Sequence, residues 1–118
     1  LDNLPINLEI LYCNYNEIKN LDNLPYNLKE LYCGTNNITT LDNLPFNLEI
    51  LICYENKIIN LNNLPQSLKY LNCIYNNITN LDNLPSGLEI LYCYDNPLIY
   101  NFNPTLENIK NYNANLKN

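Results

Sequence analysis

The chain repeats itself every 20 residues, and this period constrains the fold more than any other feature. Cysteine recurs every 20 residues without exception. The block Leu-Asp-Asn-Leu-Pro recurs with the same period, except that Asn62 replaces the aspartate in one unit. The blocks begin at Leu1, Leu21, Leu41, Leu61 and Leu81. A fixed period of about 20–50 residues is typical of proteins whose like units stack along one axis and contact mainly their neighbours. We therefore expect a single array that offers a long surface rather than a pocket.

Each unit places its apolar residues in the pattern L-x-x-L-x-C-x-x-N-x-I. The first unit shows it as Leu8, Leu11, Cys13, Asn16 and Ile18. The alternation in L-x-C predicts a short strand with one buried face. Stacked strands would lie about 4.8 Å apart, so each inward position becomes a ladder. The Leu-Pro of each block predicts an extended return segment, because proline lacks an N–H donor and disfavours helix.

This pattern resembles the leucine-rich repeat, and the resemblance covers residues 1–100. The short period and the Leu-Pro-x-x-Leu element are similar to the short class of repeat found in bacterial effector proteins. The richness in asparagine, tyrosine and isoleucine is similar to repeats encoded by giant viruses or amoebae. Cysteine at the third leucine position departs from the usual pattern. The resemblance implies a repeat solenoid of the α/β type without true helices, with a parallel β-sheet on one face and extended or 3₁₀ segments on the other.

The period divides the chain into residues 1–100, which form five repeats, and residues 101–118. The last segment still fits the pattern loosely through Leu106, Ile109, Asn111, Ala114 and Leu116. The step from Leu88 to Leu106 is 18 residues instead of 20. We therefore expect residues 101–118 to form a degenerate sixth turn or a C-terminal cap.

Composition excludes several functions. The net charge is −6, and the chain has no histidine. It also lacks arginine, and this acidic balance argues against the clustered cations that phosphates require, so we expect no nucleic-acid partner. No apolar run approaches the roughly 20 residues of a membrane-spanning helix. With serine only at Ser67 and Ser86 and carboxylates spread along the array, we expect no catalytic residues and no cofactor.

Two columns of inward residues are predicted to be structural. The cysteines show no metal-ligand spacing, so we expect small apolar filler and no metal; their pattern favours a reducing intracellular compartment. The asparagines are expected to satisfy backbone groups where the chain leaves each strand. The residues are Cys13, Cys33, Cys53, Cys73 and Cys93, with Asn16, Asn36, Asn56, Asn76 and Asn96.

A third column consists of Asp2, Asp22, Asp42 and Asp82. Stacked carboxylates could collect calcium, which needs 6–8 oxygen ligands. The favoured interpretation is an Asx turn, in which each side chain bonds its own local backbone.

The outward face of the predicted strands is apolar where an isolated protein should be polar. Such patches mark interaction sites, and tyrosine is enriched at binding hot spots; the plain alternative is that tyrosine and isoleucine suit strands. The predicted binding surface consists of Ile10, Tyr12, Tyr32, Ile50, Ile52, Tyr54, Tyr70, Ile74, Ile90, Tyr92 and Tyr94.

The function predicted from these features is non-enzymatic recognition of a protein through the sheet face. The first alternative is a structural building block that assembles with itself end to end or face to face, which the open first turn at Leu1 favours. The second alternative is the targeting part of a larger effector whose catalytic domain lies outside this chain, which only the resemblance suggests.

Overall fold

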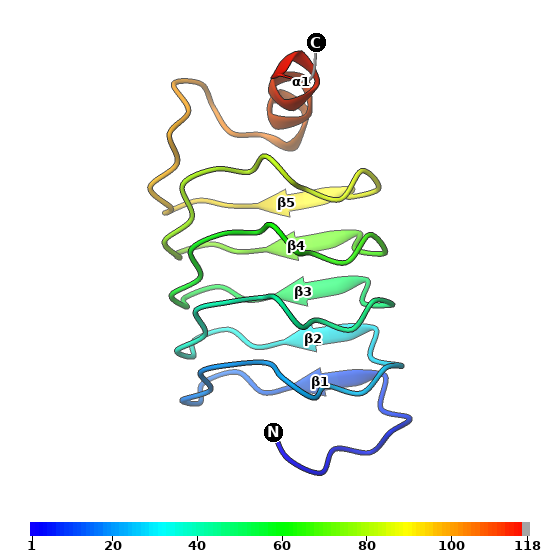
Figure 1. The fold of residues 1–118 in the computed structure, drawn as a ribbon. Helices are drawn as coiled ribbons and strands as arrows, with labels where there is room; N and C mark the ends of the chain where they lie inside the picture. The colour runs from blue at the N-terminus through cyan, green and yellow to red at the C-terminus, as the bar shows by residue number, and fades with distance from the viewer. Residues whose placement is uncertain (117–118) are drawn as a thin grey trace.

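The computed structural model describes residues 1–116, and it forms one solenoid with five short strands stacked along its axis (Figure 1). The strands are β1 (Ile10–Tyr12), β2 (Glu30–Tyr32), β3 (Ile50–Ile52), β4 (Tyr70–Asn72) and β5 (Ile90–Tyr92). They form one parallel sheet in chain order. Leu11 lies opposite Leu31, and Leu31 opposite Leu51, so the register follows the sequence period without an offset. We call each 20-residue unit, one strand with its return segment, a rung.

Backbone hydrogen bonds extend the pairing beyond the three residues of each strand. After β1, the Cys13 N–H donates to the Tyr32 carbonyl at 2.8 Å, and the Tyr15 N–H donates to the Gly34 carbonyl at 2.9 Å. Before β2, the Lys29 N–H donates to the Glu9 carbonyl at 2.8 Å. The same bonds recur up the stack, which satisfies backbone groups that burial would otherwise leave unpaired.

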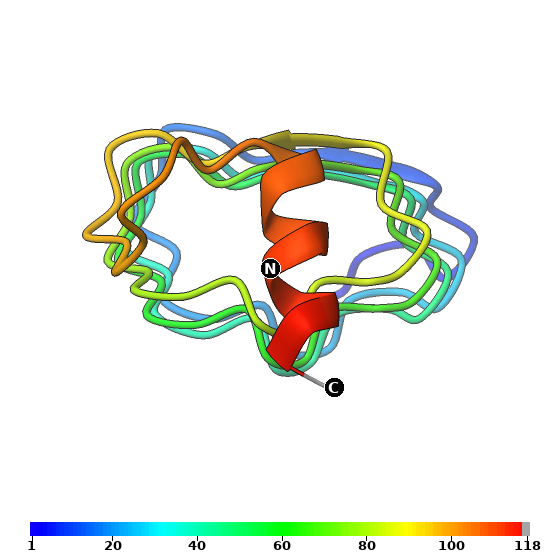
Figure 2. The same cartoon turned by 90° about the horizontal axis from the view of Figure 1, so that it is seen from above.

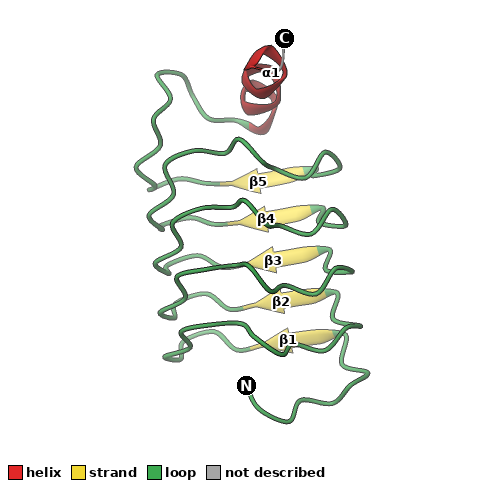
Figure 3. Ribbon diagram, in the orientation of Figure 1, coloured by secondary structure: helices red, strands yellow, loops and turns green. Residues whose placement is uncertain are grey.

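The return segments are extended and broken by turns, and they contain no helix within residues 1–100 (Figure 3). The Leu-Pro-x-x-Leu element forms one of these turns: the Leu28 N–H donates to the Pro25 carbonyl at 3.2 Å. The other four rungs repeat this bond at Leu8, Leu48, Leu68 and Leu88. Proline at this position costs no hydrogen bond, because its carbonyl is the group that accepts.

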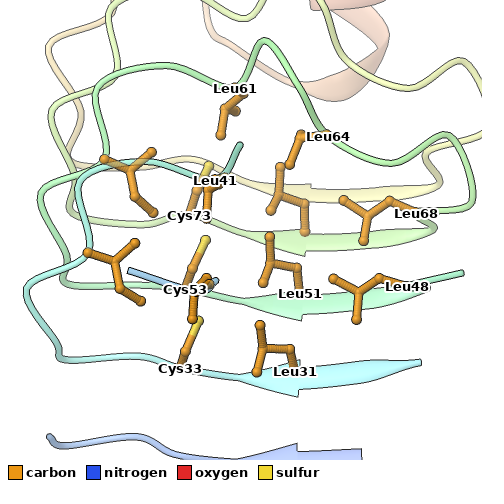
Figure 4. Close-up of a cluster of buried hydrophobic side chains, with 14 of the residues drawn as sticks. Leu31, Cys33, Leu41, Leu48, Leu51, Cys53, Leu61, Leu64, Leu68 and Cys73 are labelled. Carbon is orange, nitrogen blue, oxygen red and sulfur yellow. The ribbon is translucent and has the colours of Figure 1, made fainter. Parts of the chain in front are cut away.

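The core consists of stacked inward side chains. Figure 4 shows cysteine above cysteine and leucine above leucine in successive rungs, all directed into the interior. In the second rung Leu28, Leu31, Cys33 and Ile38 have no exposed surface. Each fully buried leucine contributes about 1.5–3 kcal/mol of apolar transfer free energy. The predicted repeat solenoid with a parallel sheet on one face is confirmed.

The chain ends in a helix, α1 (Leu106–Leu116), which lies across the end of the stack beyond β5 (Figures 1 and 2). Ile109 of this helix is fully buried against the last rung. The Lys110 ammonium donates to the Leu88 carbonyl at 3.1 Å, and the Asn113 amide donates to the Leu81 carbonyl at 2.9 Å. The helix therefore covers apolar and polar groups that the last rung would otherwise present to water.

The expectation of a solenoid without helices holds for residues 1–105 and not for residues 106–116. The helix is set by local signals. Thr105 caps it, because its hydroxyl accepts from the Asn108 N–H at 3.1 Å. Glu107 adds a negative charge to the first helical turn, where the helix dipole stabilises it. The segment that fits a loose sixth repeat by spacing is therefore helical.

Candidate functional site

The sheet face carries the residues that the sequence predicts as a binding surface. Their side chains project from the strands, opposite to the buried ladders, or from the residue two positions beyond each strand. They differ in exposure. The most accessible are at the two ends of the stack, namely Ile10, Tyr12, Ile90, Tyr92 and Tyr94, whereas Tyr32, Ile50, Ile52, Tyr54, Tyr70 and Ile74 are half-buried.

The tyrosine rings of this face pack against one another along the axis of the stack. Tyr12 and Tyr32 are stacked, with ring centroids 4.5 Å apart and an interplanar angle of 18°. Tyr70 and Tyr92 are tilted at a centroid distance of 5.9 Å. Ile52 lies between the two pairs in the strand register, opposite Tyr32. The sheet face thus has two aromatic centres separated by an aliphatic one.

Gly34 makes room for a third aromatic side chain. A Cβ atom at Gly34 would overlap the ring of Tyr54 from the next rung. The ring therefore lies directly on the backbone of the second rung. The hydroxyl of Tyr15, in the first rung, raises the pKa of Tyr54 by hydrogen bonding. One side chain thus reaches across two rungs, and the glycine that permits this is a feature the sequence shows only as a gap in a column of larger residues.

Glu30 is the one charged residue within the five strands. The Tyr32 hydroxyl donates to its carboxylate at 2.7 Å. This hydrogen bond, with a smaller contribution from burial, raises the pKa of Tyr32 to about 12. Glu30 is not one of the residues predicted to form the binding surface, although its position in the period places it beside Tyr12 and Tyr32.

The asparagines of the repeat pattern connect each rung to the one before it by hydrogen bonds. The Asn36 amide nitrogen lies 3.0 Å from the Cys33 carbonyl and 3.1 Å from the Cys13 carbonyl of the preceding rung. Its amide oxygen accepts from the Ile18 N–H at 3.0 Å. Asn56, Asn76 and Asn96 make the equivalent bonds, whereas Asn16 donates to carbonyls of its own rung. These amides satisfy buried backbone groups at the point where the chain leaves the strand.

The five cysteines are buried free thiols. Desolvation raises the pKa of Cys33, Cys53 and Cys73 well above the ordinary value, and it raises those of Cys13 and Cys93 less. A thiol held in its protonated form is a poor nucleophile and a poor metal ligand. Within residues 1–116, no three histidine, cysteine, aspartate or glutamate side chains lie close enough to hold a metal ion.

The aspartates interact differently from the predicted Asx turns, and that prediction is wrong for Asp22 and Asp42. The Asx turn is made by the preceding polar residue, as Asn20 Oδ1 accepts from the Asp22 N–H at 3.2 Å. The carboxylate of Asp22 instead accepts from Asn43 of the next rung at 2.7 Å. Asn63 donates to Asp42 in the same way, which lowers the pKa of Asp42.

A second apolar patch lies on the return side and was missed from the sequence. It consists of Ile6, Tyr26 and Phe46, which are 80%, 76% and 68% exposed. Tyr26 and Phe46 are tilted against each other at 6.5 Å. The three occupy one position of the period, followed by the polar Gln66 and Ser86. The column of Ile6, Tyr26 and Phe46 at one position of the period is the sequence signal for this return patch.

These observations define the chain as a leucine-rich repeat protein with short, 20-residue repeats. The solved structure of a Shigella effector leucine-rich repeat domain is similar to it, with 41% sequence identity and a TM-score of 0.77. The similarity covers 87% of this chain and 48% of that one, so this chain spans about half the length of the domain it matches. No family model and no curated protein matches the sequence. No helix within residues 1–116 has the length and apolar character needed to cross a bilayer.

Proposed function

We propose that the chain is a non-enzymatic recognition module that binds a protein through its sheet face. The observation that carries this proposal is the contrast between a uniform interior and a varied apolar exterior on the same strands. Leucine occupies the central inward position of all five strands, while the outward neighbours are tyrosine, isoleucine, asparagine and glutamate. The aromatic pairs Tyr12–Tyr32 and Tyr70–Tyr92 present large rings with few degrees of freedom, a property of binding hot spots.

The rigidity of the support favours this function. Each outward side chain projects from a strand whose backbone is paired with its neighbours in an unbroken five-stranded sheet. Because the backbone is ordered before a partner arrives, little conformational entropy is lost on binding. A leucine-rich repeat domain of an effector has the same architecture, which supports the related idea that this chain is the targeting part of a larger effector.

The experiment uses a photo-cross-linking amino acid on either side of the solenoid. Position 52 lies at the centre of the sheet face, and position 66, an exposed glutamine, lies on the return side. In cell extract, the residue at position 52 should cross-link one protein that the residue at position 66 does not. The triple variant Tyr32→Ser, Ile52→Ser, Tyr54→Ser should then bind that protein at least about 30-fold more weakly, because one central hot spot is worth about 2 kcal/mol or more.

Tyr26→Ser is the matched control, since it removes an exposed aromatic ring from the return side. It should change the affinity less than any single substitution of the triple variant. Circular dichroism should show that the triple variant stays folded, because the inward ladders are untouched. Equal binding by the triple variant and the parent would contradict the proposal.

Self-association is the second candidate, and the return patch is the observation that favours it. Ile6, Tyr26 and Phe46 form an exposed apolar surface on the side away from the strands. If this patch joins copies of the chain, light scattering should give a mass that rises with protein concentration, and Phe46→Ser should abolish the rise. A constant monomer mass for the parent chain excludes this candidate.

A further inference from the structure

Within residues 1–116, the sheet face carries a carboxylate, that of Glu30, that makes no ion pair. Glu30 is half-buried between two rungs, and it accepts a hydrogen bond from Tyr32 at 2.7 Å. Its neighbour in the sequence, Lys29, is directed to Glu9 at 3.9 Å, in the one ion pair within residues 1–116. A carboxylate held on an apolar surface gains more from a cation than one in open solvent, since less water competes for it.

The rings beside Glu30 suit the same kind of ligand. Tyr12 is 69% exposed and is stacked at 4.5 Å on Tyr32, whose hydroxyl is bonded to Glu30. The face of an aromatic ring attracts cations through its quadrupole. Among cationic side chains, arginine is favoured here, because a planar guanidinium can stack on a ring while its N–H groups bond a carboxylate.

The charge around the site has the matching sign. The five strands, with the three residues on either side of each, contain six carboxylates and only two ammonium groups. One of these two lysines already pairs with Glu9. The carboxylates are Glu9, Glu30, Glu49, Glu55, Glu89 and Asp95, and the lysines are Lys29 and Lys69. The whole chain carries a net charge of −6 and has no arginine. A second copy of the chain therefore cannot supply a guanidinium, so the occupant is a different protein.

We propose that the sheet face docks a basic segment of its partner, with an arginine side chain bound by the Glu30 carboxylate and the stacked rings of Tyr12 and Tyr32. This inference rests on the proposed recognition function and names the chemistry of its partner. Electrostatic attraction between the acidic face and a basic segment also accelerates association at low ionic strength.

The test is an NMR titration of the folded chain with two capped pentapeptides. One contains a single arginine between glycine and serine residues, and the other contains citrulline, which keeps the shape of arginine without its charge. The arginine peptide should shift the amide signals of Tyr12, Glu30 and Tyr32 in a saturable manner. The citrulline peptide should bind about tenfold more weakly, as expected for the loss of a charge-assisted hydrogen bond.

Two variants assign the effect to the site. Glu30→Gln keeps the shape of the side chain and an acceptor for Tyr32, and it should weaken arginine binding by about tenfold. Glu107→Gln makes the same change in net charge on the exposed first turn of α1, and it should leave binding unchanged. Equal shifts with the citrulline peptide, or full arginine binding by Glu30→Gln, would overturn the inference.

The outcome is separable from that of the proposed function. If the triple variant loses the cross-linked partner while Glu30→Gln keeps full affinity for it, the sheet face binds a protein but the arginine site is wrong. If neither variant loses the partner, the recognition surface lies elsewhere and both proposals fail.

Discussion

The inward and outward sides of the same five strands follow different rules. On the inward side, Leu11 is followed up the stack by Leu31, Leu51, Leu71 and Leu91. On the outward side, one residue further along, the column reads Tyr12, Tyr32, Ile52, Asn72 and Tyr92. Each of these inward leucines packs on the equivalent leucine of the neighbouring rung, so the same residue type fits this position in every rung. Outward residues are free of that requirement, so their identity reports on what the face contacts.

The largest effect is expected when two adjacent residues, one on each side of β3, are substituted and compared. Leu51→Ala should lower the free energy of unfolding by about 4 kcal/mol, because Leu51 is fully buried between leucines of the neighbouring rungs and the cavity cannot close. Ile52→Ala, on the other side of β3, should cost about 1 kcal/mol. Urea unfolding of both variants measures the difference. Equal losses would show that the sheet face is as much a part of the core as the interior.

Two asparagines, the inward Asn56 and the outward Asn72, allow the same comparison for polar side chains. Asn56→Ala should cost about 3 kcal/mol, since it leaves the Ile38 N–H without its buried acceptor and removes one of the two asparagine donors to each of the Cys33 and Cys53 carbonyls. Asn72→Ala on the sheet face removes one local bond to the Ile74 N–H and should cost about 0.5 kcal/mol. The midpoints of urea unfolding give both values. A small loss at Asn56 would mean that water replaces the amide.

The buried thiols predict a loss of stability in alkali. Burial raises the pKa of Cys53 in the folded chain, so the unfolded chain releases this proton first as the pH rises past about 9. The contribution of this thiol to the free energy of unfolding is therefore fully present below that pH and is lost progressively above it. Between pH 8 and pH 10 the thiol should contribute a loss of about 1.4 kcal/mol. Cys53→Ala should show a correspondingly smaller decline in chemical unfolding at the two pH values, whereas Ser67→Ala should decline like the parent.

The smallest expected effect is a gain in stability at the edge of the sheet face. Thr35 has a φ of 56°, a left-handed conformation that is unfavourable for a β-branched residue, and no group in residues 1–116 forms a hydrogen bond with its hydroxyl. Thr35→Gly should therefore raise the free energy of unfolding by about 1 kcal/mol. Asp95 occupies the equivalent position with a φ of 58°. Asp95→Gly should gain less in thermal unfolding, because aspartate tolerates this conformation better.

The sequence period predicted the sheet well and the surface less well, for a physical reason. Inward residues are determined by the period alone, so the register of Leu11 with Leu31 could be read directly. The exposure of an outward residue depends on the sizes of its neighbours along the axis. Tyr54 is half-buried because Gly34 lets its ring lie on the backbone, and no single repeat contains that information.

The C-terminal helix shows a different limit of sequence interpretation. The spacing of Leu106 and Ile109 fits both the first two leucines of a repeat and one face of a helix. Thr105, which follows Pro104, is the residue that decides between them, because its hydroxyl caps the first turn of α1. Searching residues 101–118 for capping signals would have predicted the helix.

The bonds that α1 makes with the last rung have a consequence for the evolution of this chain. The hydrogen bonds of α1 use backbone carbonyls that every rung has: Lys110 and Asn113 reach those of Leu88 and Leu81. Tyr100, whose ring packs on Tyr112 of the helix at 5.1 Å, is specific to the last rung. Deleting residues 41–80 would leave this last rung in place beneath α1 and would keep the internal phase of every ladder. Duplication or loss of whole repeats can thus change the length of the array. The breadth of the sheet face can be adjusted to a partner in this way while both ends of the stack stay unchanged.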